Sequence, residues 1–353
     1  MPLKSVTCTD FRCLESVALE LEPRFNLIYG PNASGKTSLL EAMAYLGRGR
    51  SFRGASAQHL VRHGAAEFVL FGKVDSAARE LAVGVKNSRD GLEIHIDGDK
   101  SQSAARLAEV LPLQIVDPDV HNLVAGGPED RRRYLDWVAF HVEHGYLENW
   151  RRFRRALKQR NAALKENASR EVLAGWDREF AEAGAAVDVA RRRVVDVARP
   201  AIRQSGSLLV GSEVDVEYQC GWGAGKTLAE SISTGIDRDR MLGSTQSGPH
   251  RADLRLVYDE RQAKRLVSRG QQKLLACALI LAAAEIVQRH LERRLMLLLD
   301  DPTAELDSRS LERLMGAVVA LDCQVVATSL NPDRALFPEA PRMFHVEQGA
   351  IRG

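Results

Sequence analysis

Residues 30–37 of the chain form the stretch Gly30-Pro31-Asn32-Ala33-Ser34-Gly35-Lys36-Thr37. This stretch fits the pattern GxxxxGK[ST], follows a short apolar run and opens a helical pattern, which is the context of a phosphate-binding loop. Glycine permits backbone N–H groups to surround a phosphate, and the start of a helix adds partial positive charge. We predict that Lys36 contacts the β and γ phosphates, that Thr37 coordinates Mg²⁺, and that the stretch from Gly30 to Ser38 binds ATP.

A second motif lies at 295–301, where five apolar residues precede Asp300 and Asp301. Such a run predicts a strand buried on both faces, and ligands of α/β sheets bind at the carboxyl ends of the strands. We expect Asp300 to hold Mg²⁺ through water and Asp301 to polarise the attacking water, so that Lys36, Asp300 and Asp301 are the catalytic residues. The alternative is a pair of acids that cap the following helix, and the phosphate-binding loop disfavours it.

Two further stretches resemble motifs of ABC-type ATPases. Val267-Ser268-Arg269-Gly270-Gln271-Gln272-Lys273 is similar to the signature motif, with arginine in place of its first glycine, and 304–307, ending at Asp307, is similar to the D-loop. In that superfamily the signature binds the ATP of the opposite subunit. The resemblance therefore implies nucleotide contacts from Ser268, Gly270 and Gln271 and a place for Asp307 at a subunit interface. The alternative for Ser268 is an ordinary helix cap.

Four segments narrow the resemblance to the RecF family. They are Ser51-Phe52-Arg53, residues 118–136 with the run Arg131-Arg132-Arg133-Tyr134, residues 245–253 with Gly248-Pro249-His250-Arg251, and residues 268–271. The likeness extends from Phe11-Arg12 to about residue 330. It implies a bacterial cytoplasmic ATPase that binds double-stranded and gapped DNA and forms a homodimer when ATP is bound. It also implies slow, DNA-stimulated ATP hydrolysis that acts as a switch.

The same resemblance implies a role in recombinational DNA repair, replication-fork maintenance and the SOS response. RecR and RecO would be partners in loading the recombinase onto single-stranded gaps. The alternatives are another SMC-like DNA clamp, with or without hydrolysis, the nucleotide-binding subunit of a transporter, and a P-loop kinase. A long helical insertion and the Asp300-Asp301 pair disfavour the transporter, and a kinase needs neither a signature nor a D-loop.

The chain departs from the general ABC pattern in ways that fit slow turnover. Asp301 stands where transporters have glutamate, and Thr328 or Ser329 stands where a switch histidine is usual. Gln114 is the candidate for the glutamine that senses Mg²⁺ and γ-phosphate; the alternative is a surface polar residue at a strand end. Arg12 is a candidate neighbour of the nucleotide base. Arg53 resembles a DNA-sensing arginine of SMC heads, and for both arginines the alternative is a solvated side chain.

Charge is distributed unevenly along the chain. The net charge is only +2, but residues 131–160 contain nine basic and three acidic residues, a net charge of +6. A local basic surface is what a phosphate backbone contacts. We take Arg151, Arg152, Arg154 and Arg155 as DNA-binding candidates, and the lack of interleaved aromatic residues favours duplex phosphates over stacked single strands. The alternative is that these arginines, above all 131–133, pair with local acids.

The pattern of expected secondary structure changes twice along the chain. Residues 1–117 and 241–353 alternate strand and helix patterns, whereas 118–240 is mostly helical. We predict an α/β ABC-type P-loop NTPase head, in which the two outer parts build one mixed sheet, with an inserted, mostly helical arm at 118–240. We expect the long helices of the arm to end at Arg199-Pro200. A second GKT stretch at 225–227 is predicted to be a loop, because no apolar strand precedes it.

Composition excludes several classes of protein. A chain of 353 residues allows two domains, or one domain with a large insertion. The longest apolar stretch, 274–287, falls short of the ~20 residues of a membrane span, and the N-terminus lacks the apolar core of a signal peptide. The five cysteines include no CxxC pair, which disfavours a disulfide framework or a zinc site. We therefore expect a cytoplasmic protein without a membrane partner.

Overall fold

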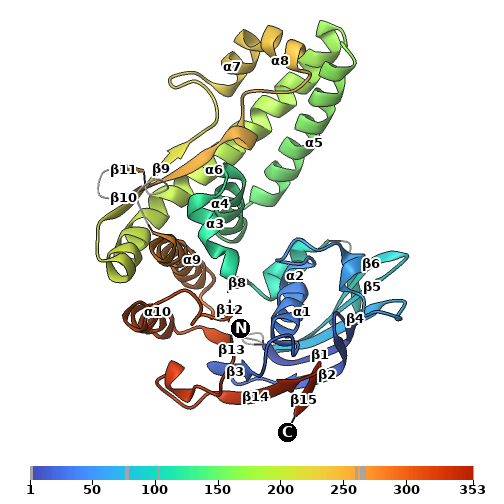
Figure 1. Ribbon diagram of the computed structural model, residues 1–353. Coiled ribbons are helices and arrows are strands. Elements are labelled where there is room, and N and C mark those ends of the chain that lie inside the picture. Colours follow the sequence, from blue (N-terminus) through green and yellow to red (C-terminus); the bar gives the residue numbers. More distant parts are fainter. Residues whose placement is uncertain (1–2, 76–78, 102, 259–260, 263–267, 353) are drawn as a thin grey trace. The chain divides into compact units, whose positions relative to one another are not determined.

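The computed structural model describes residues 3–75, 79–101, 103–258, 261–262 and 268–352. Figure 1 shows the course of the chain. The chain divides into two compact units. Unit 1 comprises Met1–Val120 and Glu292–Gly353, and unit 2 comprises His121–Leu291. Each unit is described by itself below.

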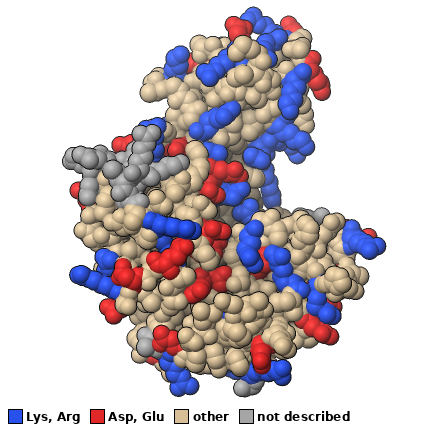
Figure 2. Space-filling view, viewed as in Figure 1, with Lys and Arg blue, Asp and Glu red and all other residues tan. Residues whose placement is uncertain are grey.

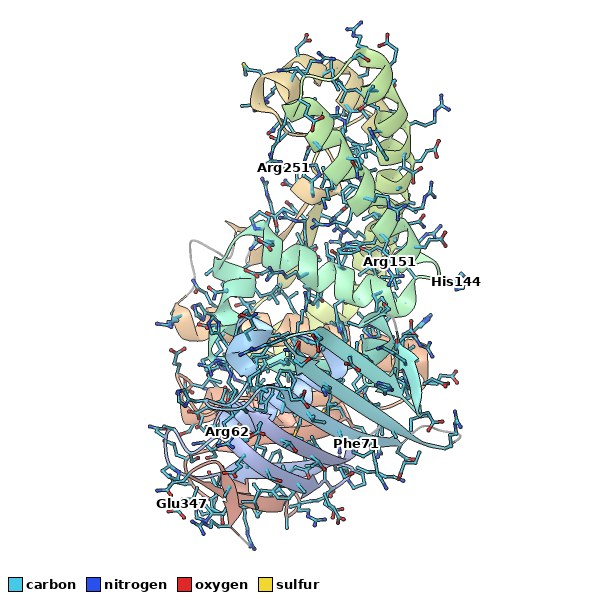
Figure 3. The ribbon with its side chains drawn as sticks, turned by 90° about the vertical axis from the view of Figure 1, so that its right-hand side faces the viewer. Arg62, Phe71, His144, Arg151, Arg251 and Glu347 are labelled. Atoms are coloured by element: carbon cyan, nitrogen blue, oxygen red, sulfur yellow. The ribbon has the colours of Figure 1, made fainter. Side chains whose placement is uncertain are left out.

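Unit 1 contains a six-stranded antiparallel sheet with the order β2-β1-β4-β5-β6-β7. Its strands are β1 (Leu3–Phe11), β2 (Leu14–Glu20), β4 (Phe68–Asp75), β5 (Glu80–Ser88), β6 (Gly91–Ile96) and β7 (Asp99–Ser101). Along β4, Phe68 and Leu70 are buried, whereas Phe71 lies on the outer face that is turned toward the viewer in Figure 3. This alternation is typical of a sheet with one buried face. The strand pattern predicted within residues 1–117 is confirmed for this part of the chain.

A second sheet in unit 1 has the order β15-β14-β3-β13-β12-β8. Its strands are β3 (Phe25–Tyr29), β8 (Leu113–Val116), β12 (Met296–Leu299), β13 (Gln324–Ser329), β14 (Arg342–Glu347) and β15 (Ala350–Arg352). The strands from β14 to β8 are parallel, and β15 is antiparallel to β14. The two outer parts of the chain do share this sheet. The prediction of a single sheet is nevertheless wrong, because the N-terminal part builds the antiparallel sheet alone.

Helix α1 (Lys36–Arg48) packs against strands of both sheets. Its buried face includes Leu39, Leu40 and Met43, which belong to one hydrophobic core with Phe68 of the antiparallel sheet and Val326 of the parallel sheet. Helices α2 (Ala105–Val110) and α10 (Ser308–Ala320) complete the regular helices described in unit 1. The core therefore fixes the orientation of α1, whose first turn follows the phosphate-binding loop.

Unit 2 is mostly helical and includes a small antiparallel sheet in the order β11-β10-β9. Its helices are α3 (Asn122–Ala125), α4 (Pro128–Val142), α5 (Tyr146–Lys165), α6 (Arg170–Val210), α7 (Leu228–Thr234), α8 (Ile236–Leu242) and α9 (Arg269–Leu291). Its strands are β9 (Val214–Gln219), β10 (Asp253–Tyr258) and β11 (Arg261–Gln262). Helix α6 packs along α5 and α9 (Figure 1). The long helices predicted for the arm are therefore present.

Helix α6 does not end at Arg199-Pro200, so that prediction is wrong. The helix continues through Pro200 to Val210 and ends at Gly211, whose φ of 78° forms a left-handed cap. Proline inside a helix removes one backbone hydrogen bond and costs about 3 kcal/mol. Ala198, Ala201 and Ile202 are buried around Pro200. Packing of these residues offsets the cost and keeps the helix intact.

The division into units differs from the predicted one on its C-terminal side. Residues 241–291, assigned from sequence to the P-loop head, belong to unit 2. Strand β10 pairs with β9, and α9 packs against α3, α4 and α6. A local sequence pattern predicts whether a segment is a strand or a helix. It does not predict which other element buries the apolar face of that segment. The structure therefore moves these elements from the predicted head into the second unit.

Helix α9 is apolar around its whole circumference. Its 23 residues are long and apolar enough to cross a bilayer, so the expectation that this stretch is too short is wrong. However, 72% of its most apolar window is buried inside the protein. A helix that is apolar on all sides and surrounded by other helices is a core helix.

Candidate nucleotide-binding site

The phosphate-binding loop connects β3 to α1 in unit 1. Gly35 has φ 113°, a conformation that favours glycine, and is the N-cap of α1. A Cβ on Gly30 would lie 2.1 Å from the carbonyl oxygen of Val346 on β14, so the neighbouring strand leaves no room for a side chain. Residues 31–33 are exposed, whereas Ser34 is buried. The free N–H groups of the first turn of α1 face this loop, as an anion site requires.

Lys36 lies across the loop. Its Nζ donates hydrogen bonds to the carbonyl oxygens of Gly30 and Pro31, each at 2.8 Å. Burial lowers the pKa of Lys36, and the nearby carboxylates of Asp301 and Asp300 oppose this shift. The structure thus brings Lys36 and the two predicted catalytic carboxylates together. The ammonium group is held where a bound phosphate would meet it.

Thr37 and Asp300 meet at the carboxyl end of β12. Thr37 Oγ1 donates to Asp300 Oδ1 at 3.0 Å, and Thr328 Oγ1 donates to the same oxygen at 2.8 Å. Burial raises the pKa of Asp300, and the hydrogen bonds from Thr328 and Thr37 act in the opposite direction. Hydroxyl and carboxylate oxygens are the ligands that Mg²⁺ prefers. The residues predicted to bind the metal therefore fit the cation, which when bound would polarise the phosphoryl oxygens.

Asp301 has an unusual backbone conformation. Its φ is 49°, in the left-handed region, and its N–H donates to Thr328 Oγ1 at 2.9 Å. Its carboxylate accepts a hydrogen bond from Thr303 Oγ1 at 2.7 Å. The side chain is half-buried. These contacts hold the carboxylate beside the loop, where a residue that activates water would stand.

Asp117 is an additional carboxylate that the sequence reasoning missed. It follows β8 directly, and β8 pairs with β12 so that Asp300 N–H donates to the carbonyl oxygen of Val116 at 2.8 Å. Burial and the charges of Asp119 and Asp300 raise the pKa of Asp117 to about 6. The sequence does indicate Asp117, because this residue follows a short apolar run, as Asp300 does. The sequence reading began its motif one residue later, at Pro118.

Gln114 is not a surface residue, so that alternative is wrong. Its side chain is buried on β8 opposite Leu297, and its Oε1 accepts a long hydrogen bond of 3.5 Å from Arg48 Nη2. Burial and the charge of Arg50 lower the pKa of Arg48 to about 10. The same Nη2 donates to the carbonyl oxygen of Leu113 at 3.2 Å. The role of Gln114 as a sensor of γ-phosphate stays a prediction.

Arg12 is anchored to α1 by a buried carboxylate. Its Nε and Nη2 donate to the two oxygens of Glu41 at 2.8 and 3.0 Å, and Glu41 has no exposed surface. The alternative of a solvated Arg12 is therefore wrong. Ser51 Oγ donates to the same carboxylate and accepts the N–H of Arg53 at 3.1 Å. Arg53 is exposed, and its charge acts on Asp300 to lower the pKa of that carboxyl.

The signature residues lie at the start of α9, in unit 2. Ser268 Oγ accepts the N–H of Gln271 at 3.3 Å, and Gln271 Oε1 accepts the N–H of Ser268 at 2.9 Å. This reciprocal pair is a capping box, so Ser268 does cap a helix, and Gly270 is in its first turn. Residue 267, the first of the signature stretch, lies outside the described residues. The nucleotide contacts of the signature stay a prediction.

Asp307 is the N-cap of α10 in unit 1. Its carboxylate accepts hydrogen bonds from the N–H and the hydroxyl of Ser310 at 2.8 and 3.1 Å. The backbone hydrogen bond is the main cause of the lowered pKa of Asp307. The side chain therefore has a capping function within the subunit, whereas its place at a subunit interface stays a prediction.

Several arginines of the basic segment 131–160 are committed to internal contacts of unit 2. Arg131 is buried and binds Asp253 with Nε to Oδ1 at 2.7 Å, and Arg133 pairs with Glu129. Arg160 has no exposed surface and binds Asp177 and Asp239. The alternative of ion pairing is thus confirmed for part of the segment. Pairing with local acids holds for Arg133, whereas the acids that bind Arg131 and Arg160 lie far along the chain.

The exposed basic residues of α5 differ in how their charge is compensated. Arg152 forms two hydrogen bonds with Glu179 on α6, at 2.8 and 3.0 Å, and Arg154 lies over the ring of Trp150 at 5.6 Å. Among the residues that the structure describes, Arg155 and Lys158 form no ion pair. Helical spacing places one set of basic residues on a common face. We call this set the α5 ridge; it comprises Arg151, Arg154, Arg155 and Lys158.

Basic side chains are also present elsewhere on unit 2. Figure 2 shows Lys and Arg side chains gathered over the end of unit 2 where α5, α7 and α8 lie. Figure 3 shows Arg151 projecting from α5, with Arg251 on the other side of the unit. The sequence predicts DNA contacts from Arg151, Arg152, Arg154 and Arg155 of this helix. This prediction includes Arg152, whose charge Glu179 compensates, and omits Lys158.

Comparison with known proteins agrees with this geometry. Residues 2–351 match the family described as RecF/RecN/SMC N terminal domain. The chain is 39% identical to the DNA replication and repair protein RecF of Pseudomonas fluorescens, over 99% of this chain and 98% of that protein. It is 41% identical to the protein of the same name from Azotobacter vinelandii, with the same coverage.

Solved structures give the same result. A structure of the recombination mediator protein RecF with ATP, in the RecFOR pathway, superposes with a TM-score of 0.90 at 27% identity, over 99% of this chain and 96% of that one. An SMC head bound to the C-terminal winged-helix domain of ScpA superposes with a TM-score of 0.62 at 14% identity, which shows a shared fold. The fold is thus that of an ABC-type ATPase head with an inserted helical unit. From the sequence match over nearly its whole length, the chain belongs to the RecF family.

Proposed function

We propose that this protein is an ATP-dependent DNA-binding switch of recombinational repair and replication-fork maintenance. The observation that carries the proposal is the assembly of Lys36, Thr37, Asp300 and Asp301 around one loop of unit 1. Relatives named DNA replication and repair protein RecF, and a RecF structure with ATP, support it. The protein would bind ATP with Mg²⁺ and bind double-stranded and gapped DNA.

Each residue of the site has a task that follows from its contacts. The N–H groups at the start of α1 and the Lys36 ammonium bind and orient the phosphates. Thr37 and Asp300 offer oxygens to the cation. Asp301 is placed to accept a proton from the attacking water, and its short side chain, in place of glutamate, suits slow turnover. ATP hydrolysis would then end the ATP-bound state of the protein, and rapid turnover would not be needed.

Binding of DNA would take place on unit 2, and dimerisation would join the two kinds of ATP-binding motif. Arg155 and Lys158 of the α5 ridge, which form no ion pair among the described residues, offer their charge to duplex phosphates. The phosphate-binding loop and the signature lie in different units of one chain, and in a homodimer each signature would meet the ATP of its partner. RecR and RecO are the proposed partners, because the RecF structure that resembles this chain belongs to the RecFOR pathway. Loading of the recombinase at gaps is the proposed outcome.

The decisive experiment compares two variants for ATP binding, ATP-dependent dimerisation and hydrolysis. Lys36→Ala should bind ATP at least about 100-fold more weakly and stay monomeric. The variant lacks the ammonium group, which would donate charge-assisted hydrogen bonds to the phosphates. Asp301→Asn should bind ATP, form the dimer and lose hydrolysis. Fluorescent-nucleotide titration, sedimentation velocity and phosphate release, each with and without gapped duplex DNA, measure these effects. The proposal would be overturned if the wild-type protein stayed monomeric with ATP and if gapped duplex DNA changed neither its ATP binding nor its hydrolysis.

A further inference from the structure

Thr328 occupies the inner end of the ATP-binding site, where it touches no solvent. It lies on β13 between β3 and β12 and has 0% exposed surface. Its hydroxyl donates to Asp300 Oδ1 at 2.8 Å and accepts the N–H of Asp301 at 2.9 Å. One side chain of a neighbouring strand therefore holds both acidic residues that follow β12.

These two hydrogen bonds define what the hydroxyl is able to do. A threonine hydroxyl has a single proton to donate, and Asp300 accepts it. Thr328 is therefore unavailable as a donor to a γ-phosphate, although its position in the chain is that of the switch residue of ABC ATPases. Its neighbour Ser329 accepts the N–H of Asn331 through Oγ at 3.3 Å, a bond that does not use the proton of its own hydroxyl.

The backbone at Asp301 gives the second hydrogen bond its importance. A residue with a Cβ in the left-handed region costs on the order of 1 kcal/mol, and Asp301 has φ 49°. Such conformations persist when surrounding contacts hold them. The bond from Asp301 N–H to Thr328 is one such contact, and the bond from Thr303 to the Asp301 carboxylate is another.

We propose that Thr328 is a positioning residue for the Mg²⁺–ATP site. Its hydroxyl orients the Asp300 carboxylate toward the cation and fixes the turn that presents Asp301. Thr37 also donates to Asp300 Oδ1, but the Thr37 oxygen is itself expected to bind the metal. Thr328 is the donor that remains with Asp300 when Thr37 turns to the cation. This inference rests on the proposed ATP-binding function and assigns a residue to it.

The test measures how much Mg²⁺ strengthens nucleotide binding. A fluorescent ATP analogue is titrated in Mg²⁺ and in EDTA with the full-length wild type, Thr328→Val, Thr328→Ala and Thr328→Ser. Thr328→Val and Thr328→Ala lose both hydrogen bonds, and the bond to Asp300, worth about 1 kcal/mol, accounts for about a fivefold to tenfold change in Mg²⁺-dependent affinity. We expect Thr328→Val and Thr328→Ala to lose about that factor in Mg²⁺ and little in EDTA. Thr328→Ser, which keeps the hydroxyl, should restore wild-type binding.

The control for the chemical change itself is Thr9→Val, on the exposed face of β1, which should bind as the wild type does. Equal affinity of Thr328→Val and wild type in Mg²⁺ would overturn the proposal. So would an equal loss in Mg²⁺ and EDTA, which indicates a general structural defect, or a failure of Thr328→Ser to rescue. If the wild type itself does not bind ATP, the proposed function fails instead.

Discussion

Glu41 lies on α1 with no exposed surface, and its carboxylate accepts hydrogen bonds from two other segments of unit 1. Arg12 from the turn between β1 and β2 forms two hydrogen bonds with it, and Ser51 donates a third. Arg12 also donates to the carbonyl oxygen of His59 at 3.2 Å. A sequence pattern places Glu41 inside a helix but cannot show that its partner is 29 residues away. The carboxylate joins the helix of the phosphate-binding loop to the segment that carries Arg53.

Replacement Glu41→Gln should destabilise the protein by about 3 kcal/mol, because removal of one partner leaves Arg12 partly buried and uncompensated. Urea unfolding followed by circular dichroism measures the effect. The matched control is Glu67→Gln, since Glu67 pairs with Lys86 at 2.8 Å on the surface. Surface pairs contribute about 0–1 kcal/mol. Equal losses for the two variants would contradict the importance of the buried site.

His250 makes the stability of unit 2 depend on pH. Burial lowers its pKa to about 4, and its Nε2 donates to the carbonyl oxygen of Thr245 at 2.9 Å. Below the unfolded pKa of 6.5, the unfolded chain binds a proton that folded His250 does not. Stability should therefore fall by on the order of 3 kcal/mol as the pH drops from 6.5 to 4, and this loss is absent above 6.5.

The measurement is urea unfolding at several pH values, followed by tryptophan fluorescence. All four tryptophans, at 137, 150, 176 and 222, lie in unit 2, so the signal reports this unit. His250→Gln keeps a donor for Thr245 but cannot be protonated. Its stability should change less between pH 6.5 and 4 than that of the wild type. An equally steep decline would assign the pH dependence to other groups.

At the scale of elements, α5 carries basic residues that form ion pairs within the unit, and it also carries exposed basic residues, of which Arg155 and Lys158 form no ion pair among the described residues. Arg160 turns inward to Asp177 and Asp239, Arg152 turns to α6, and the α5 ridge faces solvent. The sequence gives the spacing of these side chains along one helix. Only the position of α6, with Glu179, decides which of the charges is compensated.

The double variant Arg155→Ala/Lys158→Ala should bind duplex DNA more weakly and lower the slope of log affinity against log salt by about 2, since each contact to phosphate contributes about 1. Arg152→Ala is the matched control on the same helix, and its slope should change little because Glu179 already compensates its charge. Fluorescence anisotropy with a labelled duplex at several salt concentrations measures both. An unchanged slope in the double variant would place the DNA on another surface.

At the scale of the whole molecule, the phosphate-binding loop and the stretch that resembles the signature lie in separate units. The loop and both carboxylates belong to unit 1, and the signature belongs to unit 2. If the signature acts on the ATP of a partner subunit, Ser268→Arg should bind ATP normally but fail to dimerise. Ser169→Arg, the same change at the start of α6, should dimerise as the wild type does.

Mixing gives a sharper form of this test. Lys36→Ala and Ser268→Arg should each remain monomeric with ATP. An equimolar mixture should form dimers, because the intact signature of the first variant meets the intact loop of the second. Sedimentation velocity of the separate proteins and of the mixture measures this. Normal dimerisation of Ser268→Arg alone would remove the composite site from the proposal.

The sequence by itself determined the local features of this protein. The order of strands and helices in unit 1, the phosphate-binding loop and the Asp300-Asp301 pair all follow from residue types at short spacing, since periodicity and turn chemistry are local properties. Asp117 was also within reach of this reasoning, because it ends a strand as Asp300 does. The net charge of residues 131–160 follows from the sequence, but the sequence does not show which of these arginines form ion pairs.

Only the tertiary structure decided which distant residues share a surface. It moved residues 241–291 into unit 2 through the pairing of β10 with β9, and it carried α6 through Pro200 by packing. It also showed the hydrogen bonds from Thr328 to Asp300 and from Arg12 to Glu41. The physical reason is the same in each case. Burial and hydrogen bonding join residues that lie tens to hundreds of positions apart, and no local pattern records the partner.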